Sequence, residues 1–277
     1  MPKIKNAVII CGPGRSGTTL LSSILSLHKD FYWISGYVNR FPESPFLSVL
    51  NNLQRLDWFE KFNRGRKYFP RPAEAYGFWY HYFDEFDTPG AKPSQLETFN
   101  AIRAIEGIDN YSSANRFITK LTGKSRIHFI EAMFEDPIIL WIDRQPEAVV
   151  MSYYKQRWRY KNKPGQFAAK PTNELITEYC DLFLAVQEDR EKLKKFEFHQ
   201  VFYEDMVSDP VGFFKALTND LGLKQRPSFY RKVQGWGIFK GSNESYKKLI
   251  SPEEDAFLQQ QLAGVSETIG YTKKLNN

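Results

Sequence analysis

Residues 7–19 read AVIICGPGRSGTT, an apolar run that passes into a glycine-rich turn and then into a pair of threonines. Residues 6–11 are continuous and partly β-branched, the pattern of a strand buried on both faces of a parallel sheet. Residues 18–28 carry leucine and isoleucine at helical spacing, and residues 31–35 predict the next strand. A glycine turn between a buried strand and a helix presents backbone N–H groups to an anion. The stretch therefore predicts an α/β fold with an anion-binding loop.

Two later segments repeat this order of strand and helix. Residues 138–142 predict a buried strand before a helix at 147–158, and residues 200–203 predict a strand before a helix at 210–221. Alternating strands and helices predict a doubly wound, mainly parallel sheet flanked by helices. Further helical patterns fall at about 45–62, 94–105, 126–134, 172–195 and 252–269, whereas residues 160–171 are the most loop-like. We expect a single domain over residues 1–277, with cleft-forming helical insertions at about 36–112 and 159–195.

The composition excludes several classes of protein. With 42% hydrophobic and 25% charged residues, the 277-residue chain is ordinary for a globular protein and too apolar for a disordered one. The formal charge of +6 suits an anionic ligand as well as nucleic acid. Cys11 and Cys180 lie far apart in the sequence, so we expect no disulfide and a reducing, cytoplasmic location. No apolar run is long enough to predict a signal peptide or a membrane span.

The glycine loop keeps the spacing of the nucleoside-triphosphate loop G-x-x-x-x-G-K-[ST] but lacks its lysine. Thr18 stands at the lysine position and Thr19 at the Ser/Thr position. The cation lies inside the loop at Arg15, where a guanidinium binds a phosphate oxygen or a group being transferred from it. This difference disfavours the alternative of a divergent P-loop kinase or NTPase. A basic module for RNA or single-stranded DNA is a further alternative, which no run of Lys and Arg supports.

Two motifs, which follow each other along the chain in the family's order, resemble those of the sulfotransferases that use 3′-phosphoadenosine 5′-phosphosulfate (PAPS). The segment RSGTTLL at residues 15–21 looks like their 5′-phosphosulfate loop. Their second motif is an Arg at the end of a buried strand with a Ser eight residues later, and Arg144 and Ser152 match it. Since ligands of open α/β sheets bind at the carboxyl ends of strands, both residues are placed to hold a second phosphate there.

Two further motifs extend the resemblance to about residue 271. Tyr203 in YEDM, residues 203–206, is similar to the tyrosine that lies by the adenine in that family. Lys240 and Gly241 resemble the family's Lys-Gly pair, with Tyr246 at the position where the family usually has Trp. The resemblance implies a P-loop sulfotransferase architecture, PAPS as co-substrate and 3′-phosphoadenosine 5′-phosphate (PAP) as product. The donor-binding residues that it implies are Gly14, Arg15, Ser16, Gly17, Thr18, Thr19, Arg144, Ser152, Tyr203, Lys240 and Gly241.

Sulfonate transfer resembles phosphoryl transfer in needing in-line placement and neutralised charge more than covalent help from the protein. Arg15 supplies one cation, and Lys120 corresponds to the lysine that the resemblance assigns to the sulfonate and bridging oxygen. We expect no metal, because the sequence offers no acidic cluster that suits Mg²⁺. The reaction predicted is metal-independent transfer to a hydroxyl or amine of a small-molecule or glycan acceptor, with no nucleic-acid partner.

An acceptor hydroxyl needs a general base within hydrogen-bond reach. Cytosolic family members carry a His soon after the lysine, whereas this chain has Leu, Thr and Gly at residues 121–123. Other members use a glutamate not far beyond the first helix, which makes Glu43 the leading candidate. Glu74 and His81, which flank the aromatic run at 76–83, are the alternatives, and each of the three also suits a surface or packing role. That run and a second at 153–160 are expected to line the acceptor cleft.

Overall fold

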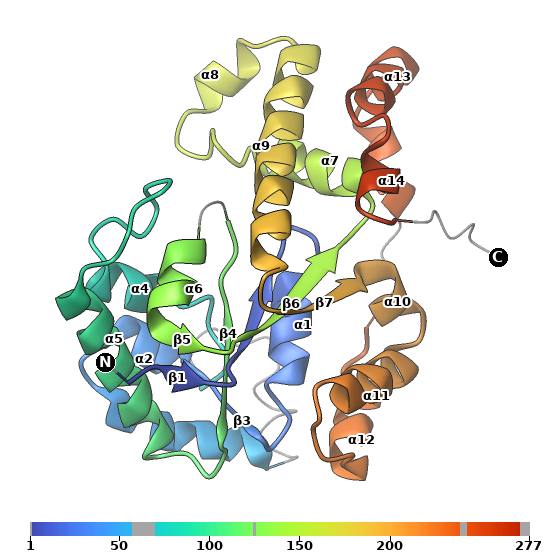
Figure 1. Ribbon diagram of the computed structural model, residues 1–277. Helices are drawn as coiled ribbons and strands as arrows, with labels where there is room; N and C mark the ends of the chain where they lie inside the picture. The colour runs from blue at the N-terminus through green and yellow to red at the C-terminus, as the bar shows by residue number, and fades with distance from the viewer. Residues whose placement is uncertain (1, 57–69, 124–125, 239–242, 272–277) are drawn as a thin grey trace.

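The computed structural model describes residues 2–56, 70–123, 126–238 and 243–271 (Figure 1). At its centre is a five-stranded sheet in the order β3-β4-β2-β6-β7, and every pair of neighbouring strands is parallel. These strands are β3 (Phe31–Tyr32), β4 (Arg116–Lys120), β2 (Val8–Cys11), β6 (Ile138–Asp143) and β7 (Glu197–Phe202). A separate parallel pair joins β1 (Ile4–Lys5) to β5 (Phe134–Glu135). The predicted α/β class and parallel sheet are confirmed.

Apolar cores cover both faces of the sheet, which explains the continuous apolar run of β2 and most of β6 at its centre. Along β2, Ile9 and Cys11 belong to one core, whereas Val8 and Ile10 belong to the other. The first core packs beneath α4 (Tyr76–Tyr82), α5 (Gln95–Asp109) and α6 (Ile127–Met133). The second packs beneath α1 (Thr18–Leu25), α11 (Pro210–Asp220) and α12 (Pro227–Gly235).

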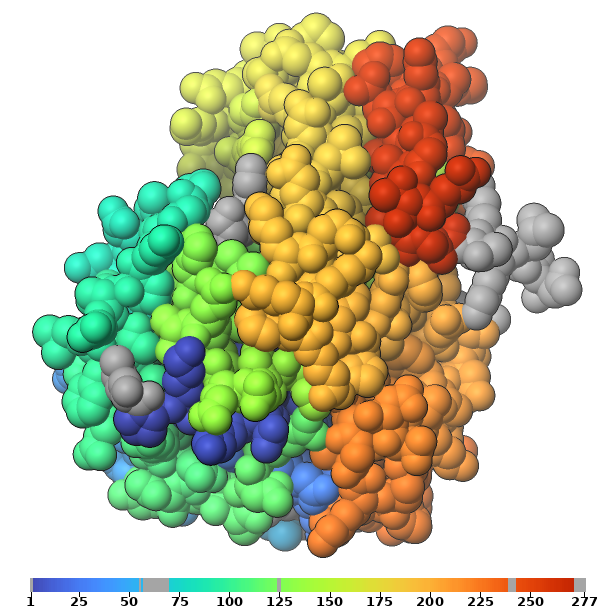
Figure 2. All heavy atoms as spheres, viewed as in Figure 1, coloured from blue at the N-terminus to red at the C-terminus, as the bar shows by residue number. Residues whose placement is uncertain are grey.

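A third core lies beyond the sheet, where α7 (Pro146–Gln156), α9 (Thr172–Leu193) and α13 (Pro252–Gln261) pack together. In the space-filling view α9 and α13 lie side by side on the face shown (Figure 2). The remaining helices are α2 (Gly36–Arg40), η1 (Pro45–Arg55), α8 (Pro164–Ala168), α10 (Tyr203–Ser208), η2 (Asn243–Lys248) and α14 (Val265–Thr268). The expected insertion at 36–112 thus contains α2, η1, α4 and α5, and that at 159–195 contains α8 and α9. Their role as cleft walls, and the single-domain organisation, stay predictions.

Several helices differ from their sequence patterns for local reasons. The pattern at 45–62 becomes the 3₁₀ helix η1, which ends at Arg55 because Leu56 is extended. The pattern at 252–269 is divided in two: α13 ends at Gln261, and Gly264, with a φ of 74°, is the N-cap of α14. The loop-like stretch 160–171 contains one short helix, α8.

Cys11 and Cys180, for which the sequence predicts no disulfide, are both free and buried. Within the ranges that the structure describes, none of the helices combines the length and the apolar character needed to cross a membrane. The cytoplasmic location stays a prediction.

Gly12, at the end of β2, leaves no room for a side chain. Its φ is +138°, and a Cβ there would lie 2.5 Å from the carbonyl oxygen of Ile142. We expect Gly12→Ala to lower the free energy of unfolding by about 3 kcal/mol, because backbone strain and crowding act together. Urea unfolding measures this loss.

The control is Gly222→Ala, at a glycine with a φ of +63° and open space around it. This variant should lose only about 1 kcal/mol, the cost of a left-handed backbone. Equal losses in the two variants would contradict the close approach of Gly12 to β6.

Candidate active site

The glycine loop joins the central strand β2 to α1 at the carboxyl end of the sheet. Crevices at this position, where the strand order changes direction, are where open α/β sheets bind ligands. Gly17 is the N-cap of α1 with a φ of 102°, so the first N–H groups of the helix face the loop. Arg15 has a φ of 69°, a conformation uncommon outside glycine that often marks functional sites. This backbone geometry suits the binding of an anion, as the sequence predicts.

The small residues of the loop are of two kinds. The Ser16 side chain is fully buried and its hydroxyl donates to the carbonyl oxygen of Pro13 at 2.7 Å, so it closes the loop on itself. Thr18 is also buried, whereas Thr19 is exposed. Gly14 lies against Tyr153, whose ring a Cβ at Gly14 would meet at 3.4 Å. Of the three hydroxyl residues Ser16, Thr18 and Thr19, Thr19 is the exposed one.

The first two motifs meet through a hydrogen bond. Arg15 Nε donates to Ser152 Oγ at 3.0 Å, which joins the loop to α7. Arg144 follows the end of β6, and its Nη1 donates to the carbonyl oxygen of Arg15 at 3.3 Å. Two guanidinium groups and one hydroxyl therefore converge beside the loop, as the strand-end placement of Arg144 predicts.

The Arg144 guanidinium is oriented by contacts on two sides. It lies 4.4 Å from the centre of the Tyr203 ring, and its Nε and Nη2 donate to Asn243 Oδ1 at 3.0 and 2.8 Å. Asn243 Nδ2 in turn donates to Glu204 Oε1 at 2.6 Å. Sequence reasoning missed Asn243 and Glu204 as site residues. Their positions give a signal, since Glu204 follows Tyr203 and Asn243 comes soon after Gly241.

The third and fourth motifs differ in what the structure describes. The ring of Tyr203 also lies against Gly17, where an added Cβ would be 2.6 Å from Tyr203 Cδ2. Tyr203 therefore borders both the loop and Arg144. Lys240 and Gly241 lie outside the described residues.

Lys120 and Glu74 form a polar cluster on the other side of the loop. Lys120 ends β4 with only 4% of its surface exposed, and its Nζ donates to Thr19 Oγ1 at 2.8 Å. The same ammonium forms an ion pair with Glu74, and the Thr19 hydroxyl donates to Glu74 Oε1 at 2.9 Å. One predicted catalytic cation and one candidate base are thus in direct contact.

The two charges of this cluster have shifted pKa values. Burial lowers the pKa of the Lys120 ammonium, although the Glu74 carboxylate partly offsets that shift. Burial alone would raise the pKa of Glu74, but Lys120 and the Thr19 hydroxyl outweigh it and hold this pKa below its ordinary value. Glu74 is therefore a carboxylate at neutral pH, able to accept a proton.

Glu43 and His81 lie elsewhere. Glu43 Oε1 is 3.5 Å from His81 Nε2, and the Glu43 side chain is 80% exposed. Both line an open hollow of about 590 Å³ that is also bordered by Tyr82 and Arg103. In the described parts of the chain, no hydrogen bond or ion pair connects Glu43 to the loop or to Lys120. The choice of base stays a prediction, but the geometry favours Glu74.

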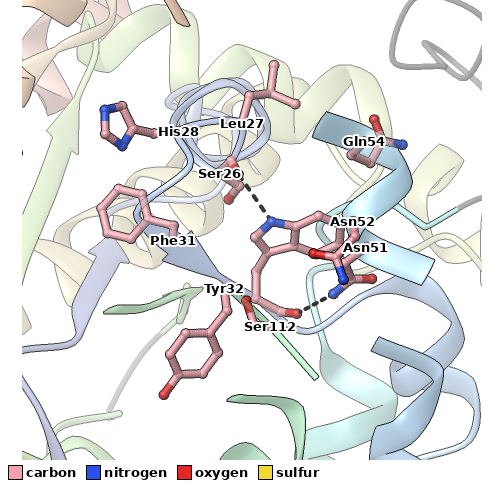
Figure 3. Close-up of a pocket in the computed structure, with 10 residues that line it drawn as sticks. Ser26, Leu27, His28, Phe31, Tyr32, Asn51, Asn52, Gln54 and Ser112 are labelled. Atoms are coloured by element: carbon pink, nitrogen blue, oxygen red, sulfur yellow. Dashed lines mark hydrogen bonds between the residues drawn. The ribbon is translucent and has the colours of Figure 1, made fainter. Parts of the chain in front are cut away.

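A smaller cavity beside the end of α1 has another character (Figure 3). Its volume is about 20 Å³, room for about one water molecule. The Trp33 indole donates to the carbonyl oxygen of Ser26 at 3.1 Å, and Asn51 donates to that of Trp33 at 3.1 Å. These bonds tie η1 to the segment after α1, so the cavity is a packing feature.

Among the described residues no three His, Cys, Asp or Glu side chains gather as a metal site requires.

The sequence of the chain matches the model of a known protein family. Residues 7–227 match the sequence profile of the sulfotransferase family, which is more than half of the chain. The chain belongs to the sulfotransferase family. It is accordingly a sulfotransferase enzyme, and the match favours that prediction over the alternative of a P-loop kinase or NTPase.

Individual sulfotransferases are similar along nearly the whole chain. The omega-hydroxy-beta-dihydromenaquinone-9 sulfotransferases of Mycobacterium bovis and Mycobacterium tuberculosis are each 20% identical over 295 residues, covering 96% of this chain and 75% of their own length. The solved structure of sulfotransferase STF9 from Mycobacterium avium has a TM-score of 0.62 and 15% identity, covering 96% of this chain and 77% of its own. The sulfotransferase domain of the Synechococcus PCC 7002 olefin synthase has a TM-score of 0.54 and 15% identity, covering 98% and 97%. The two structures show that the fold is shared.

Proposed function

We propose that this sulfotransferase transfers the sulfonate group of PAPS to a hydroxyl or amine of a small acceptor and releases PAP. One observation carries the choice of donor. Arg144 and Ser152 create a second anion site beside the loop, joined to it by the Arg15–Ser152 and Arg144–Arg15 hydrogen bonds. A 3′,5′-bisphosphorylated nucleotide has two separate phosphates to fill two such sites, and the Tyr203 ring offers its base a flat surface.

Transfer in this site relies on fixed positive charge. The acceptor oxygen attacks sulfur while the bond from sulfur to the 5′-phosphate oxygen breaks, and the bonding electrons stay on that phosphate oxygen. Arg15, Lys120 and the N–H groups at the start of α1 surround the position where this charge develops. A phosphate leaving group needs little acid assistance. Arg15, Lys120 and the helix N–H groups take the place of the positive charge that Mg²⁺ supplies in nucleotide kinases.

Glu74 is the general base in this proposal, in place of Glu43. Its carboxylate pairs with the ammonium of Lys120, and Lys120 in turn contacts the loop through Thr19. A donor that attracts the Lys120 ammonium to its own oxygens frees Glu74 to accept the proton of the acceptor hydroxyl. The exposed half of the Glu74 side chain gives the acceptor access. Glu43 has no comparable link to the loop in the described residues.

The donor assignment predicts a selective effect of Arg144→Ala. Removing one charged hydrogen-bond partner of the 3′-phosphate should weaken PAP binding about 10- to 100-fold. ADP, which lacks that phosphate, should lose little affinity. Calorimetric titration of both ligands measures the difference, with Arg231→Ala on the exposed face of α12 as the control. Equal losses for PAP and ADP, or none for PAP, would contradict the assignment of Arg144.

The choice of base predicts different outcomes for two glutamates. In Glu74→Gln we expect kcat to fall by about 100-fold or more with PAP affinity retained, because the proton acceptor is lost. Glu43→Gln is the matched control and should keep nearly full turnover. The assay follows labelled sulfonate from PAPS into an alcohol that the wild-type enzyme accepts. Slow turnover in Glu43→Gln together with normal turnover in Glu74→Gln would make Glu43 the base.

The pKa shifts predict a bell-shaped pH profile. As pH falls, kcat/KM should decrease when Glu74 takes up a proton, with an inflection below 4.5, its ordinary pKa. As pH rises, kcat/KM should decrease when Lys120 loses its proton, with an inflection below 10.5. Glu74→Gln should lack the acid limb. Rate measurements over the pH range in which circular dichroism shows a folded protein check this, and an acid limb that persists in the variant would exclude Glu74.

A further inference from the structure

A strongly basic segment begins in the last turn of α7 and continues beyond it. Residues 155–163 read KQRWRYKNK and carry five exposed cations at alternate positions: Lys155, Arg157, Arg159, Lys161 and Lys163. None of the five forms an ion pair with a described residue. The carboxylates of Glu174 and Glu178 on α9, which lie nearby, are paired with Lys170 instead.

This basic segment adjoins the donor loop through Trp158. The Trp158 ring edge would be 3.7 Å from a Cβ at Gly14, and its centre is 5.6 Å from that of Tyr153, which packs on the same glycine. Trp158 is nevertheless 42% exposed. The Lys161 ammonium lies 5.5 Å from the centre of the Trp158 ring. An exposed indole with a cation beside it therefore borders the loop on the side of α7.

The proposed donor does not require these cations. Its 3′-phosphate is matched by Arg144 and Ser152, and its phosphosulfate by Arg15, Lys120 and the loop amides. A run of charge is commonly no more than a solvated face. Here it coincides with a large exposed aromatic ring beside the loop, and an aromatic ring with a cation over it can bind the flat body of a ligand as well as its charge.

We propose that the acceptor carries an anionic group, a phosphate or a carboxylate, that binds to this basic segment. Lys161 and Lys163 hold the anion, and the flat or apolar body of the acceptor stacks on Trp158, with its hydroxyl directed toward the loop. The positive segment also speeds the approach of an anionic acceptor at low salt. This inference rests on the proposed function, because it takes the loop to hold the donor.

The test measures binding of 1-naphthyl phosphate and of uncharged 1-naphthol to the protein saturated with PAP. Equilibrium dialysis with naphthyl fluorescence gives both affinities. The wild-type protein should bind the phosphate about tenfold more tightly than the alcohol or better, and added salt should reduce the difference. Lys161→Glu combined with Lys163→Glu should abolish the preference and leave PAP affinity unchanged. Lys215→Glu combined with Lys224→Glu, an equal change of charge at exposed positions on α11 and just after it, should retain the preference.

Three results would overturn the inference. The first is equal binding of the two probes by the wild-type protein, and the second is no detectable binding of the phosphate. The third is a double variant that keeps the preference, and a loss of PAP affinity in that variant would assign the cations to the donor instead. The PAP titration that precedes the dialysis tests the proposed function separately. If PAP fails to bind while the preference for 1-naphthyl phosphate persists, the anionic site stands and the donor assignment falls.

Discussion

The approach of the loop backbone to β6 determines where the other groups of the site lie. Gly12 sits against the carbonyl oxygen of Ile142, closer than any side chain permits. Because Arg144 follows Ile142 by two residues, this contact brings its guanidinium to the rim of the loop, where it meets the carbonyl of Arg15. Pro146 then begins α7, and Ser152 on that helix returns to Arg15. A single packing contact between parallel strands thus holds together the groups of the two proposed anion sites.

Charge is divided between the two sides of this loop. Toward β6 lie Arg144, Ser152 and Tyr203, which suit a nucleotide that carries a second phosphate. Toward β4 lies Lys120, whose buried ammonium is compensated by Glu74. An uncompensated ammonium at that depth would be costly, so Glu74 stabilises Lys120 before the donor arrives. In the proposed mechanism the negative sulfonate replaces Glu74 as the partner of Lys120, so that donor binding releases the base.

Local patterns in the sequence predicted those parts of this site that are formed by residues close together in the sequence. The buried strands, the glycine turn and the strand-end position of Arg144 follow from composition and spacing within short segments. The contact between Glu74 and Lys120 joins residues from an α4-flanking segment and a strand, and no short-range spacing predicts it. Asn243 likewise reaches Arg144 across 99 positions of sequence. The sequence pattern also did not predict that η1 is a 3₁₀ helix, because the same spacing of apolar residues fits an α-helix.

In the proposed function the loop and the Arg144 site together select a bisphosphorylated nucleotide without help from a metal. Calorimetric titration of the wild-type protein with PAP, ADP and ATP, each with and without Mg²⁺, tests it most directly. The structure predicts tight binding of PAP that is unchanged by Mg²⁺, with ADP and ATP much weaker. Preference for ATP in the presence of Mg²⁺ would contradict the claim.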